Sequence, residues 1–312
     1  MTADARAVLV AGDCNVDLVL RGDVVPRFGQ AEQLLDSGEL VVGGSASIVA
    51  HGLARLGVPT MLAARVGDDT FGRFMVDALA AAGVQTRTVA VDADLPTGMS
   101  VILSSPTDRA ILTVPGTIPT LHAADVLAAL GDAAHVHVAS YFLQPRLADG
   151  LPALFAELRS RQVTTSLDTN WDPAARWTGL AELLPLVDFL FPNLEELRAI
   201  AAAAGAPAAD DETLARHLAG FGPRVVVKAG AAGGWSVAGG RPVVTAPGLP
   251  VEVADTTGAG DSFDAGYLAA LAYGLTDEAE RLRWATTAGS LSTRAAGGTA
   301  AQAELAEVAA RA

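Results

Sequence analysis

The sequence predicts an α/β fold in which a parallel-rich sheet is covered by helices on both faces. Short apolar runs recur along the chain, and Ala/Leu-rich amphipathic stretches separate them. Alternation of this kind is typical of parallel sheets that are buried on both sides. Two regions break the alternation and predict a second, smaller sheet. The 312 residues suffice for one large domain with such an appendage.

The strands of the main sheet are expected at the short apolar runs. These runs occupy residues 7–11, 62–66, 135–139, 164–167, 189–191 and 225–227. Helices are expected at residues 47–56 and 72–82, where apolar side chains recur with the helical period. The connections between strands are therefore predicted to be helical.

The second sheet is expected in residues 14–42 and 95–115, which contain no long helical pattern. Short segments rich in Val, Ile and Thr alternate there with Gly and Pro, at residues 16–20, 39–42, 99–103 and 110–114. Because both regions interrupt the α/β core, we interpret them as a lid inserted into a single domain that spans residues 1–312.

Composition excludes several classes of function. The formal net charge is -14, whereas a nucleic-acid-binding protein usually has a basic face. No apolar run reaches the ~18 residues of a membrane helix, so no membrane partner is expected. Cys14 is the single cysteine, and the acidic N-terminal residues do not resemble a secretory signal. We expect a cytoplasmic protein.

The segment that carries chemistry is DTTGAGDSFDAGYLAAL, which begins at Asp255. It follows a probable strand at residues 251–254 and leads into a helix expected to begin near Asp261 or Ser262. Its glycines permit tight turns. The backbone amides that precede the helix predict an anion site at its N-terminus. These amides belong to Gly258, Ala259 and Gly260.

Asp261 is unusual beside an anion site, because a carboxylate repels phosphate. It could cap the helix, since Asp is a common cap residue. Alternatively, it could accept a proton from a hydroxyl group that attacks a phosphorus atom held by the amides. The residues alone leave both interpretations open.

Other nucleotide and metal motifs are missing. The sequence has no G-x-x-x-x-G-K-[ST], so it is not a P-loop enzyme, and GAGDSF lacks the third glycine of a dinucleotide fingerprint. No Cys/His cluster suggests zinc. A nucleotide-binding oxidoreductase is therefore disfavoured.

Over nearly its whole length the chain resembles the PfkB family of carbohydrate and nucleoside kinases, which has the ribokinase-like fold. DTTGAGDSFDAG is similar to the family's C-terminal signature, and GGSASIVAHGLARLG, from Gly43, to its N-terminal signature. GDCNVDLVL, FPNLEEL and VKAGAAGG also resemble family segments, in the same order. The resemblance implies a kinase with a β-sheet lid.

The resemblance implies that Asp261 is the catalytic base and that the amides of residues 258–260 form the anion hole. It assigns Asn193 and Glu196 to the orientation of Mg²⁺ and its water, so that Glu196 contacts the metal indirectly. The residues implied to lie along the nucleotide are Lys228, Gly230 and Gly233.

Further matches concern the substrate and a monovalent cation. Asp17, Gly43 and Gly44 would face the sugar hydroxyls, and Ile48 occupies a substrate-binding position. Many family members have Asn where this chain has Ile48, so the choice of sugar is expected to be unusual. Asp255 and Thr257 match the start of the family's monovalent-cation site, for which K⁺ is the candidate ion. The turn at residues 295–298 would close this site.

Two other positions bear on the site. Asp168 and Asn170, in LDTNWDP, resemble a family stretch near the site. Asp264 stands where many relatives carry Asn, and its added negative charge disfavours a sugar that is already phosphorylated.

Together these features predict an ATP-dependent sugar kinase, a phosphotransferase with an alcohol group as acceptor. It would transfer the γ-phosphoryl group to a hydroxymethyl group and use Mg²⁺. We expect a homodimer formed through the lid, because exposed strand edges invite pairing. One alternative is a nucleoside kinase, with Ile48 and Phe142 forming an apolar pocket. Another, less favoured, is a non-catalytic relative that binds sugar or nucleotide.

Overall fold

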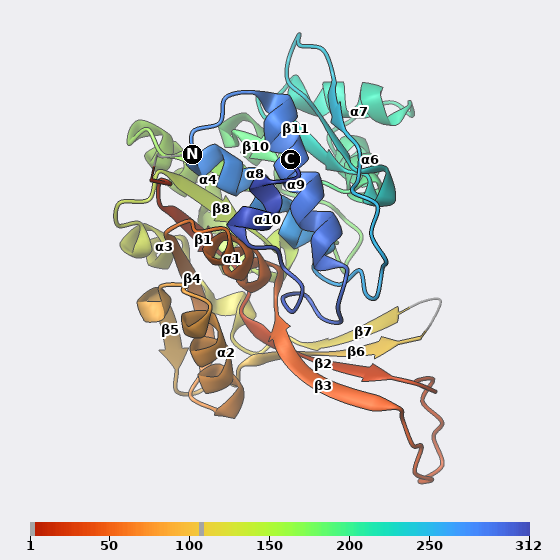
Figure 1. Cartoon of the computed structure of the whole chain (residues 1–312). Helices are drawn as coiled ribbons and strands as arrows, with labels where there is room; N and C mark the ends of the chain where they lie inside the picture. Colours follow the sequence, from red (N-terminus) through yellow and green to blue (C-terminus); the bar gives the residue numbers. More distant parts are fainter. Residues whose placement is uncertain (1–3, 106–108) are drawn as a thin grey trace.

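The structure, a computed structural model, describes residues 4–105 and 109–312. Its main element is a nine-stranded sheet with the strand order β13-β12-β11-β10-β9-β8-β1-β4-β5 (Figure 1). Neighbouring strands are parallel from β11 to β5, and β12 and β13 are antiparallel. The strands are β1 (Val8–Ala11), β4 (Thr60–Gly67), β5 (Val89–Asp92), β8 (His135–Val138), β9 (Thr164–Leu167), β10 (Phe189–Leu190), β11 (Arg224–Lys228), β12 (Gly234–Val237) and β13 (Val244–Ala246).

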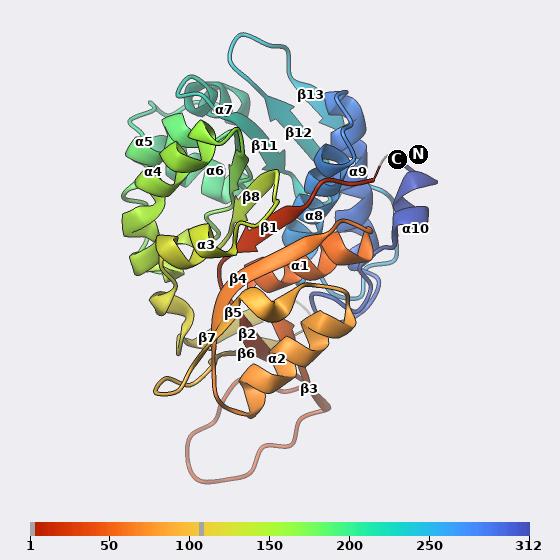
Figure 2. The ribbon, with the colours of Figure 1, turned by 90° about the vertical axis from the view of Figure 1, so that its left-hand side faces the viewer.

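Helices cover both faces of this sheet (Figure 2). Successive side chains of β1 enter opposite cores, since Val8 and Val10 belong to one cluster of buried residues and Leu9 and Ala11 to the other. The first core contains α1 (Ser45–Arg55), α2 (Thr70–Ala81), α8 (Ala259–Ala272), α9 (Glu278–Ser292) and α10 (Leu305–Ala309). The second contains α3 (Ala123–Ala129), α4 (Pro145–Ser160), α5 (Leu180–Leu183), α6 (Leu194–Ala203) and α7 (Asp211–Ala219).

The predicted α/β class is confirmed, and the six apolar runs form neighbouring strands of the main sheet. The predicted strand at residues 251–254 is wrong, because this segment pairs with no strand among the described residues; the Ala254 amide instead donates to the carbonyl of Thr293 at 2.8 Å. Helix α8 begins at Ala259, two residues before the earlier of the two predicted starts. No helix among the described residues is long and apolar enough to cross a membrane.

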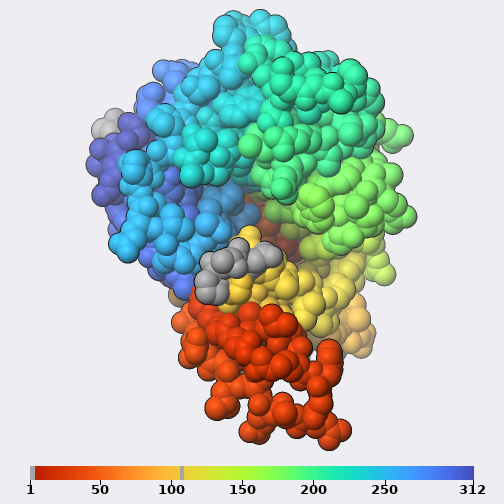
Figure 3. Space-filling view, turned by 90° about the vertical axis from the view of Figure 1, so that its right-hand side faces the viewer, coloured from red at the N-terminus to blue at the C-terminus, as the bar shows by residue number. Residues whose placement is uncertain are grey.

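The small sheet projects from the body and has the order β3-β2-β6-β7 (Figure 1). Its strands are β2 (Asn15–Arg21), β3 (Ser37–Gly43), β6 (Gly98–Ser104) and β7 (Arg109–Val114). The space-filling view shows a hollow between this sheet, in red and yellow, and the green and blue body (Figure 3). The sheet therefore forms one wall of a cleft.

The two faces of the small sheet differ in polarity. Asp17, Ser100 and Thr113 are in register on one face, and Ser100 contacts Thr113 and Asn15. The opposite face carries an aliphatic row that crosses all four strands in register: Leu40, Leu18, Val101 and Leu112. Because side chains alternate along each strand, the polar face and the apolar row point in opposite directions.

Candidate active site

Polar residues gather where parallel strands end and helix α8 begins. Asp13 follows β1, Ser140 follows β8, and Asp168 and Asn170 follow β9. The carboxyl ends of parallel strands meet at one edge of the sheet, which is where ligands bind in open α/β folds. Ser140 and Asn170 both have a positive φ, 55° and 51°, which is unusual outside glycine. Such backbone conformations concentrate at ligand sites.

Asp13 fixes the start of helix α1. Its carboxylate accepts hydrogen bonds from the amides of Ser45 (3.1 Å) and Ala46 (2.9 Å) and from Ser140 Oγ (2.8 Å). Gly44 precedes the helix with φ 84° and has no side chain to cap it. A Cβ atom there would lie 2.8 Å from the carbonyl oxygen of Asp13, so the position requires glycine. Asp13 thus holds Ser45 in place.

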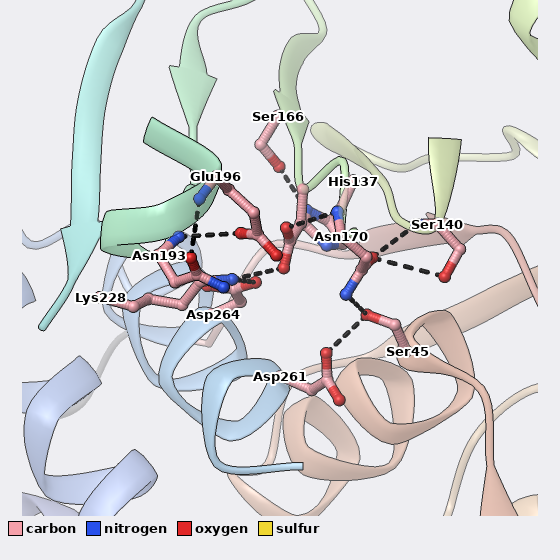
Figure 4. Close-up of polar contacts among 11 residues, drawn as sticks. Ser45, His137, Ser140, Ser166, Asn170, Asn193, Glu196, Lys228, Asp261 and Asp264 are labelled. Carbon is pink, nitrogen blue, oxygen red and sulfur yellow. Dashed lines mark hydrogen bonds and ion pairs between the residues drawn. The ribbon is translucent and has the colours of Figure 1, made fainter. Parts of the chain in front are cut away.

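Ser45 in turn orients Asp261. Ser45 Oγ donates to Asp261 Oδ1 at 2.5 Å and accepts from Asn170 Nδ2 at 3.2 Å (Figure 4). Asn170 Oδ1 accepts from the Ser140 amide at 2.8 Å. The hydrogen-bond chain therefore runs from β8 through β9 and α1 to α8, and it fixes one oxygen of the Asp261 carboxylate.

Asp261 does not cap helix α8, because Gly258 is the N-cap residue and Asp261 is the third residue of the helix. Burial raises the pKa of Asp261 to about 7; the charges of Asp168 and Asp13 add to this effect, and the Ser45 bond and Lys228 oppose it. Asp261 as a residue is intermediate in solvent exposure. A carboxylate with this pKa can exchange a proton near neutral pH.

The loop before α8 presents backbone amides at a helix N-terminus. Within the described residues, the amides of Gly258 and Gly260 have no hydrogen-bond acceptor, whereas that of Ala259 donates to the Thr256 carbonyl at 3.2 Å. Two of the three amides predicted for the anion site are thus available to a ligand. A Cβ atom on Gly258, where φ is 71°, would lie 2.7 Å from the Cα atom of Gly298, so the loop requires glycine there.

Ile48 supports this loop through Gly298. A Cβ atom on Gly298 would lie 2.6 Å from Ile48 Cδ1, and Ile48 is buried. The side-chain amide of Gln302 donates through Nε2 to the Ile48 backbone carbonyl at 3.0 Å. Ile48, Gly298 and Gly258 thus form three successive layers of packing behind the loop.

Lys228 lies among acidic groups at the floor of the site. Its Nζ atom is 2.5 Å from Asp168 Oδ2 and 3.4 Å from Asp264 Oδ2, and both carboxyl groups are fully buried. Burial opposes the charge of Lys228, but Asp168 and Asp264 outweigh burial and raise its pKa. Burial raises the pKa of Asp264 well above its usual range. A protonated Asp264 beside an ionised Asp168 would leave the cluster with no net charge.

Asn193 and Glu196 form a reciprocal cap at the start of α6. Asn193 Oδ1 accepts from the amides of Glu195 and Glu196, both at 2.9 Å, and Glu196 Oε2 accepts from the Asn193 amide at 2.8 Å (Figure 4). Burial, and then the charge of Asp168, raises the pKa of Glu196 to about 7. This pattern therefore has a structural role whatever its ligand role.

The donor set fits Mg²⁺ only when most ligands come from elsewhere. The described residues contain no group of three His, Cys, Asp or Glu side chains that could hold a metal. Glu196 Oε2 is engaged in the cap, which leaves Oε1 facing the site. Mg²⁺ commonly binds one or two carboxylates and keeps waters and substrate phosphates as its other ligands, which suits this arrangement.

A cavity of about 450 Å³ lies beside the Gly258–Gly260 loop. Gly230 and Gly233 line it together with Lys228 and Gly260. A Cβ atom on Gly233 would lie 2.2 Å from the Ala246 carbonyl oxygen, so the close approach of these two segments of the wall requires glycine. The rest of the lining is mostly apolar, as is usual for a cavity that binds a small molecule.

Asp17 faces the cleft from the small sheet. Its Oδ1 atom accepts from Asn15 Nδ2 at 3.0 Å, and its carboxylate crosses directly over Gly43, where a Cβ atom would lie 2.1 Å from that oxygen. Burial, aided by the charge of Asp13, raises the pKa of Asp17 to about 7. Gly43 therefore makes room for the Asp17 carboxylate.

Asp255 and Thr257 hydrogen-bond to each other, but their surroundings do not suit a metal cation. Asp255 Oδ1 accepts from the Thr257 amide and hydroxyl, and Oδ2 accepts from the Gly297 amide and from Arg21 Nη2. The turn at residues 295–298 does close over Asp255. The Arg21 guanidinium and the Gly297 amide nevertheless both donate to Oδ2, so this carboxylate presents no free oxygen to K⁺, and K⁺ does not fit there.

Sequence reasoning missed four residues that shape the site: Asp13, Ser45, Arg21 and Arg109. Asp13 had a usable signal, because a carboxylate directly after a buried parallel strand lies at the sheet edge that binds ligands. Arg21 and Arg109 had no such signal in the sequence, because they reach the loop before α8 only through the fold. Arg109 Nη1 donates to Thr257 Oγ1 at 3.1 Å.

Comparison with known proteins supports the same family. The sequence profile described as pfkB family carbohydrate kinase matches residues 5–304. The chain is 30% identical over 288 residues to a ribokinase of Bacillus subtilis, with 92% of each chain covered. It is 34% identical over 308 residues to a fructokinase of Klebsiella pneumoniae, covering 93% of this chain and 94% of the relative.

Solved structures with this fold include ligand complexes. Arabidopsis thaliana ribokinase complexed with ribose and ATP superposes with a TM-score of 0.85 at 26% identity, covering 98% of each chain. A Vibrio cholerae fructokinase double mutant, bound to fructose, ADP and potassium ion, gives 0.83 at 25% identity, covering 99% of each chain. The chain therefore belongs to the pfkB family of carbohydrate kinases, phosphotransferases of the ribokinase and fructokinase type with an alcohol group as acceptor.

Proposed function

We propose that this kinase transfers the γ-phosphoryl group of ATP to a hydroxymethyl group of a sugar, with Asp261 as the general base. The observation that carries the proposal is the position of the Asp261 carboxylate, which adjoins the free amides of Gly258 and Gly260 and is held by Ser45 at 2.5 Å. A base and an anion site side by side are what phosphoryl transfer to a hydroxyl requires.

ATP binds in the 450 Å³ cavity, with its γ-phosphoryl group at the loop amides and Lys228. The sugar lies in the cleft beneath the small sheet, where Asp17 accepts hydrogen bonds from its hydroxyls. As the hydroxymethyl oxygen attacks phosphorus, its proton passes to Asp261, and the amides of Gly258 and Gly260 stabilise the phosphoryl oxygens. The phosphorus–oxygen bond to ADP breaks.

Glu196 and Asn193 would hold Mg²⁺ through a water molecule, and the bound ion would reduce the negative charge of the phosphates. The small sheet would act as a lid that excludes water, so that ATP is not hydrolysed instead. Lys228 would also reduce the negative charge of the phosphates. Its Nζ atom lies beside the anion loop, 3.7 Å from the position that a Cβ atom on Gly260 would take.

A nucleoside kinase remains the second candidate, and one observation favours it. Three aromatic side chains next to Asn170 form edge-to-face contacts, with ring centroids of Phe142 and Trp177 and of Trp171 and Trp177 both 5.2 Å apart. Trp171 is 53% exposed. An exposed ring beside the site could stack on a nucleobase as well as on a sugar.

A screen that couples ADP release to each acceptor separates the candidates. Pentoses, ketoses, aldonic acids and nucleosides are supplied with ATP and Mg²⁺. We expect turnover with a free sugar and little with adenosine or inosine. Turnover with nucleosides alone would refute the sugar assignment. ATP and sugar binding without turnover of any acceptor would favour a non-catalytic relative.

We also propose a homodimer formed through the small sheet. The aliphatic row Leu40, Leu18, Val101 and Leu112 lies on the face away from the site, and Leu112 is 58% exposed. A second copy would cover this row. Leu112→Asp should convert the dimer to monomer in light scattering; a wild-type monomer would refute the dimer.

The single buried Cys14 suits a reducing cytoplasm.

A further inference from the structure

The carboxylate of Asp255 has a full set of donors. Oδ1 accepts from the Thr257 amide (2.9 Å) and from Thr257 Oγ1 (2.8 Å). Oδ2 accepts from the Gly297 amide (3.0 Å) and from Arg21 Nη2 (3.2 Å). A carboxylate offers about four lone-pair positions, and these four donors occupy them. No oxygen lone pair of this group is left for a metal ion.

Arg21 reaches Asp255 from the small sheet. It is the last residue of β2 and lies on the same strand face as Asp17, four residues earlier, so it points toward the cleft. It also forms an ion pair with Glu39, on β3, at 3.7 Å. From β7, Arg109 contacts Thr257 in the same loop. Two arginines of the small sheet thus hold the segment that leads into the amides of Gly258 and Gly260.

K⁺ and the Arg21 guanidinium cannot both bind the Asp255 carboxylate. K⁺ needs oxygen ligands, and near Asp255 the Gly297 amide and Arg21 both direct N–H groups at the carboxylate. An arginine side chain stays protonated at every pH at which the protein is folded. A second positive charge at the same oxygen would be repelled. A potassium ion, such as the Vibrio cholerae fructokinase complex contains, therefore has no place at the Asp255 carboxylate here.

We propose that Arg21 takes the place of a monovalent cation beside the anion loop, so that this kinase works without K⁺. The guanidinium supplies a permanent positive charge next to Asp255 and fixes the turn from which the Gly258 and Gly260 amides project. Arg21 is a positioning residue, because it acts on the loop and not on the reacting atoms. The attachment to β2 also makes the loop geometry depend on the position of the small sheet.

Two measurements at constant ionic strength test this inference. Initial rates are compared in potassium chloride, sodium chloride and tetramethylammonium chloride, and thermal unfolding midpoints are recorded in the same salts without substrates. The wild-type rates should agree within about twofold, and KCl should give no specific rise in the midpoint. The activity measurement rests on the proposed function; the unfolding measurement does not, so the failure of one is distinguishable from the failure of the other.

Variants of Arg21 supply the decisive comparison. Arg21→Ala should lose about tenfold or more in kcat/KM in tetramethylammonium chloride, and K⁺ or guanidinium ion should restore part of it. In this variant KCl should raise the unfolding midpoint specifically. Arg21→Lys should keep the salt independence, and Arg21→Gln replaces Arg21→Ala if the alanine variant does not fold. Arg27→Ala is the matched control, because Arg27 is exposed and contacts Asp23.

Three results would overturn the inference. The first is a wild-type rate and unfolding midpoint that both rise with K⁺ specifically. The second is an Arg21→Ala variant that behaves like the wild type in every salt. The third is a loss of activity that neither K⁺ nor guanidinium ion restores, in Arg21→Ala and Arg21→Gln alike, because Arg21 would then not act as a cation.

Discussion

Replacing Lys228 tests whether its cluster is a buried charge network. Lys228→Met removes the cationic partner of Asp168, whose side chain is fully buried, and leaves Asp264 beside it. Removing one partner of a buried ion pair costs roughly 3–5 kcal/mol, because the remaining charge has lost its compensation. We therefore expect the free energy of unfolding to fall by about this amount at neutral pH.

The pH dependence gives the sign of the effect. In the wild type, burial opposes ionisation of Asp168, but Lys228 and hydrogen bonds lower its pKa, so its stabilising contribution is present above the unfolded pKa and is lost as pH falls. In Lys228→Met the pKa of Asp168 should rise instead. The folded variant then favours the protonated acid, and its deficit should shrink as pH falls from about 7 to about 5.

The assay is urea unfolding of four proteins at both pH values. The double variant Lys228→Met/Asp168→Asn removes both charges and should recover much of the loss. Arg198→Met is the control, because Arg198 and Asp211 form an exposed pair, and exposed pairs contribute little to stability. A Lys228→Met loss no larger than that of Arg198→Met, or no recovery in the double variant, would refute the reasoning.

Two further predictions concern the cleft. Because the pKa of Asp261 is raised to about 7, kcat/KM should fall about tenfold per pH unit below that value, more steeply if Glu196 must also ionise, and a flat profile from about pH 6 to about pH 8 would contradict the assignment. Gly43→Ala places a Cβ atom 2.1 Å from Asp17 Oδ1, so kcat/KM for the sugar should fall about a hundredfold while KM for ATP stays unchanged. Gly239→Ala is the control, because a Cβ atom there makes only an ordinary van der Waals contact. Equal effects of the two substitutions would refute the packing argument.

Much of the fold could be predicted from local pattern. Strand β1 is a short apolar run buried on both faces, which is a strong signal even at four residues. Strands β8 (HVHV) and β9 (TTSL) mix polar with apolar residues, but they are short and almost wholly buried. Strands β12 and β13 were not predicted, because they lie at an edge and carry a mixed pattern. Residues 251–254 alternate like a strand, but in the part of the chain that the structure describes they pair with no strand.

The candidate site could be predicted only where one segment contains its parts. The loop at Gly258 and the carboxylate of Asp261 are three residues apart, so their proximity follows from the sequence. The start of α8 was placed too late, since glycines usually mark turns and here begin a helix. The contact of Ser45 with Asp261 spans 216 residues, and that of Arg21 with Asp255 spans 234. Contacts of this separation depend on tertiary packing.

Turnover by Asp261→Asn is the most direct test of the central claim. The change keeps the side-chain shape but removes the proton acceptor, so kcat should fall by about 10²–10⁴-fold. The dissociation constant of ATP and the unfolding midpoint should change little, because Asp261 caps no helix. Asp210→Asn, at the N-cap of α7, controls for loss of an acid at a helix start. Near-normal turnover by a folded Asp261→Asn would show that Asp261 is not the base.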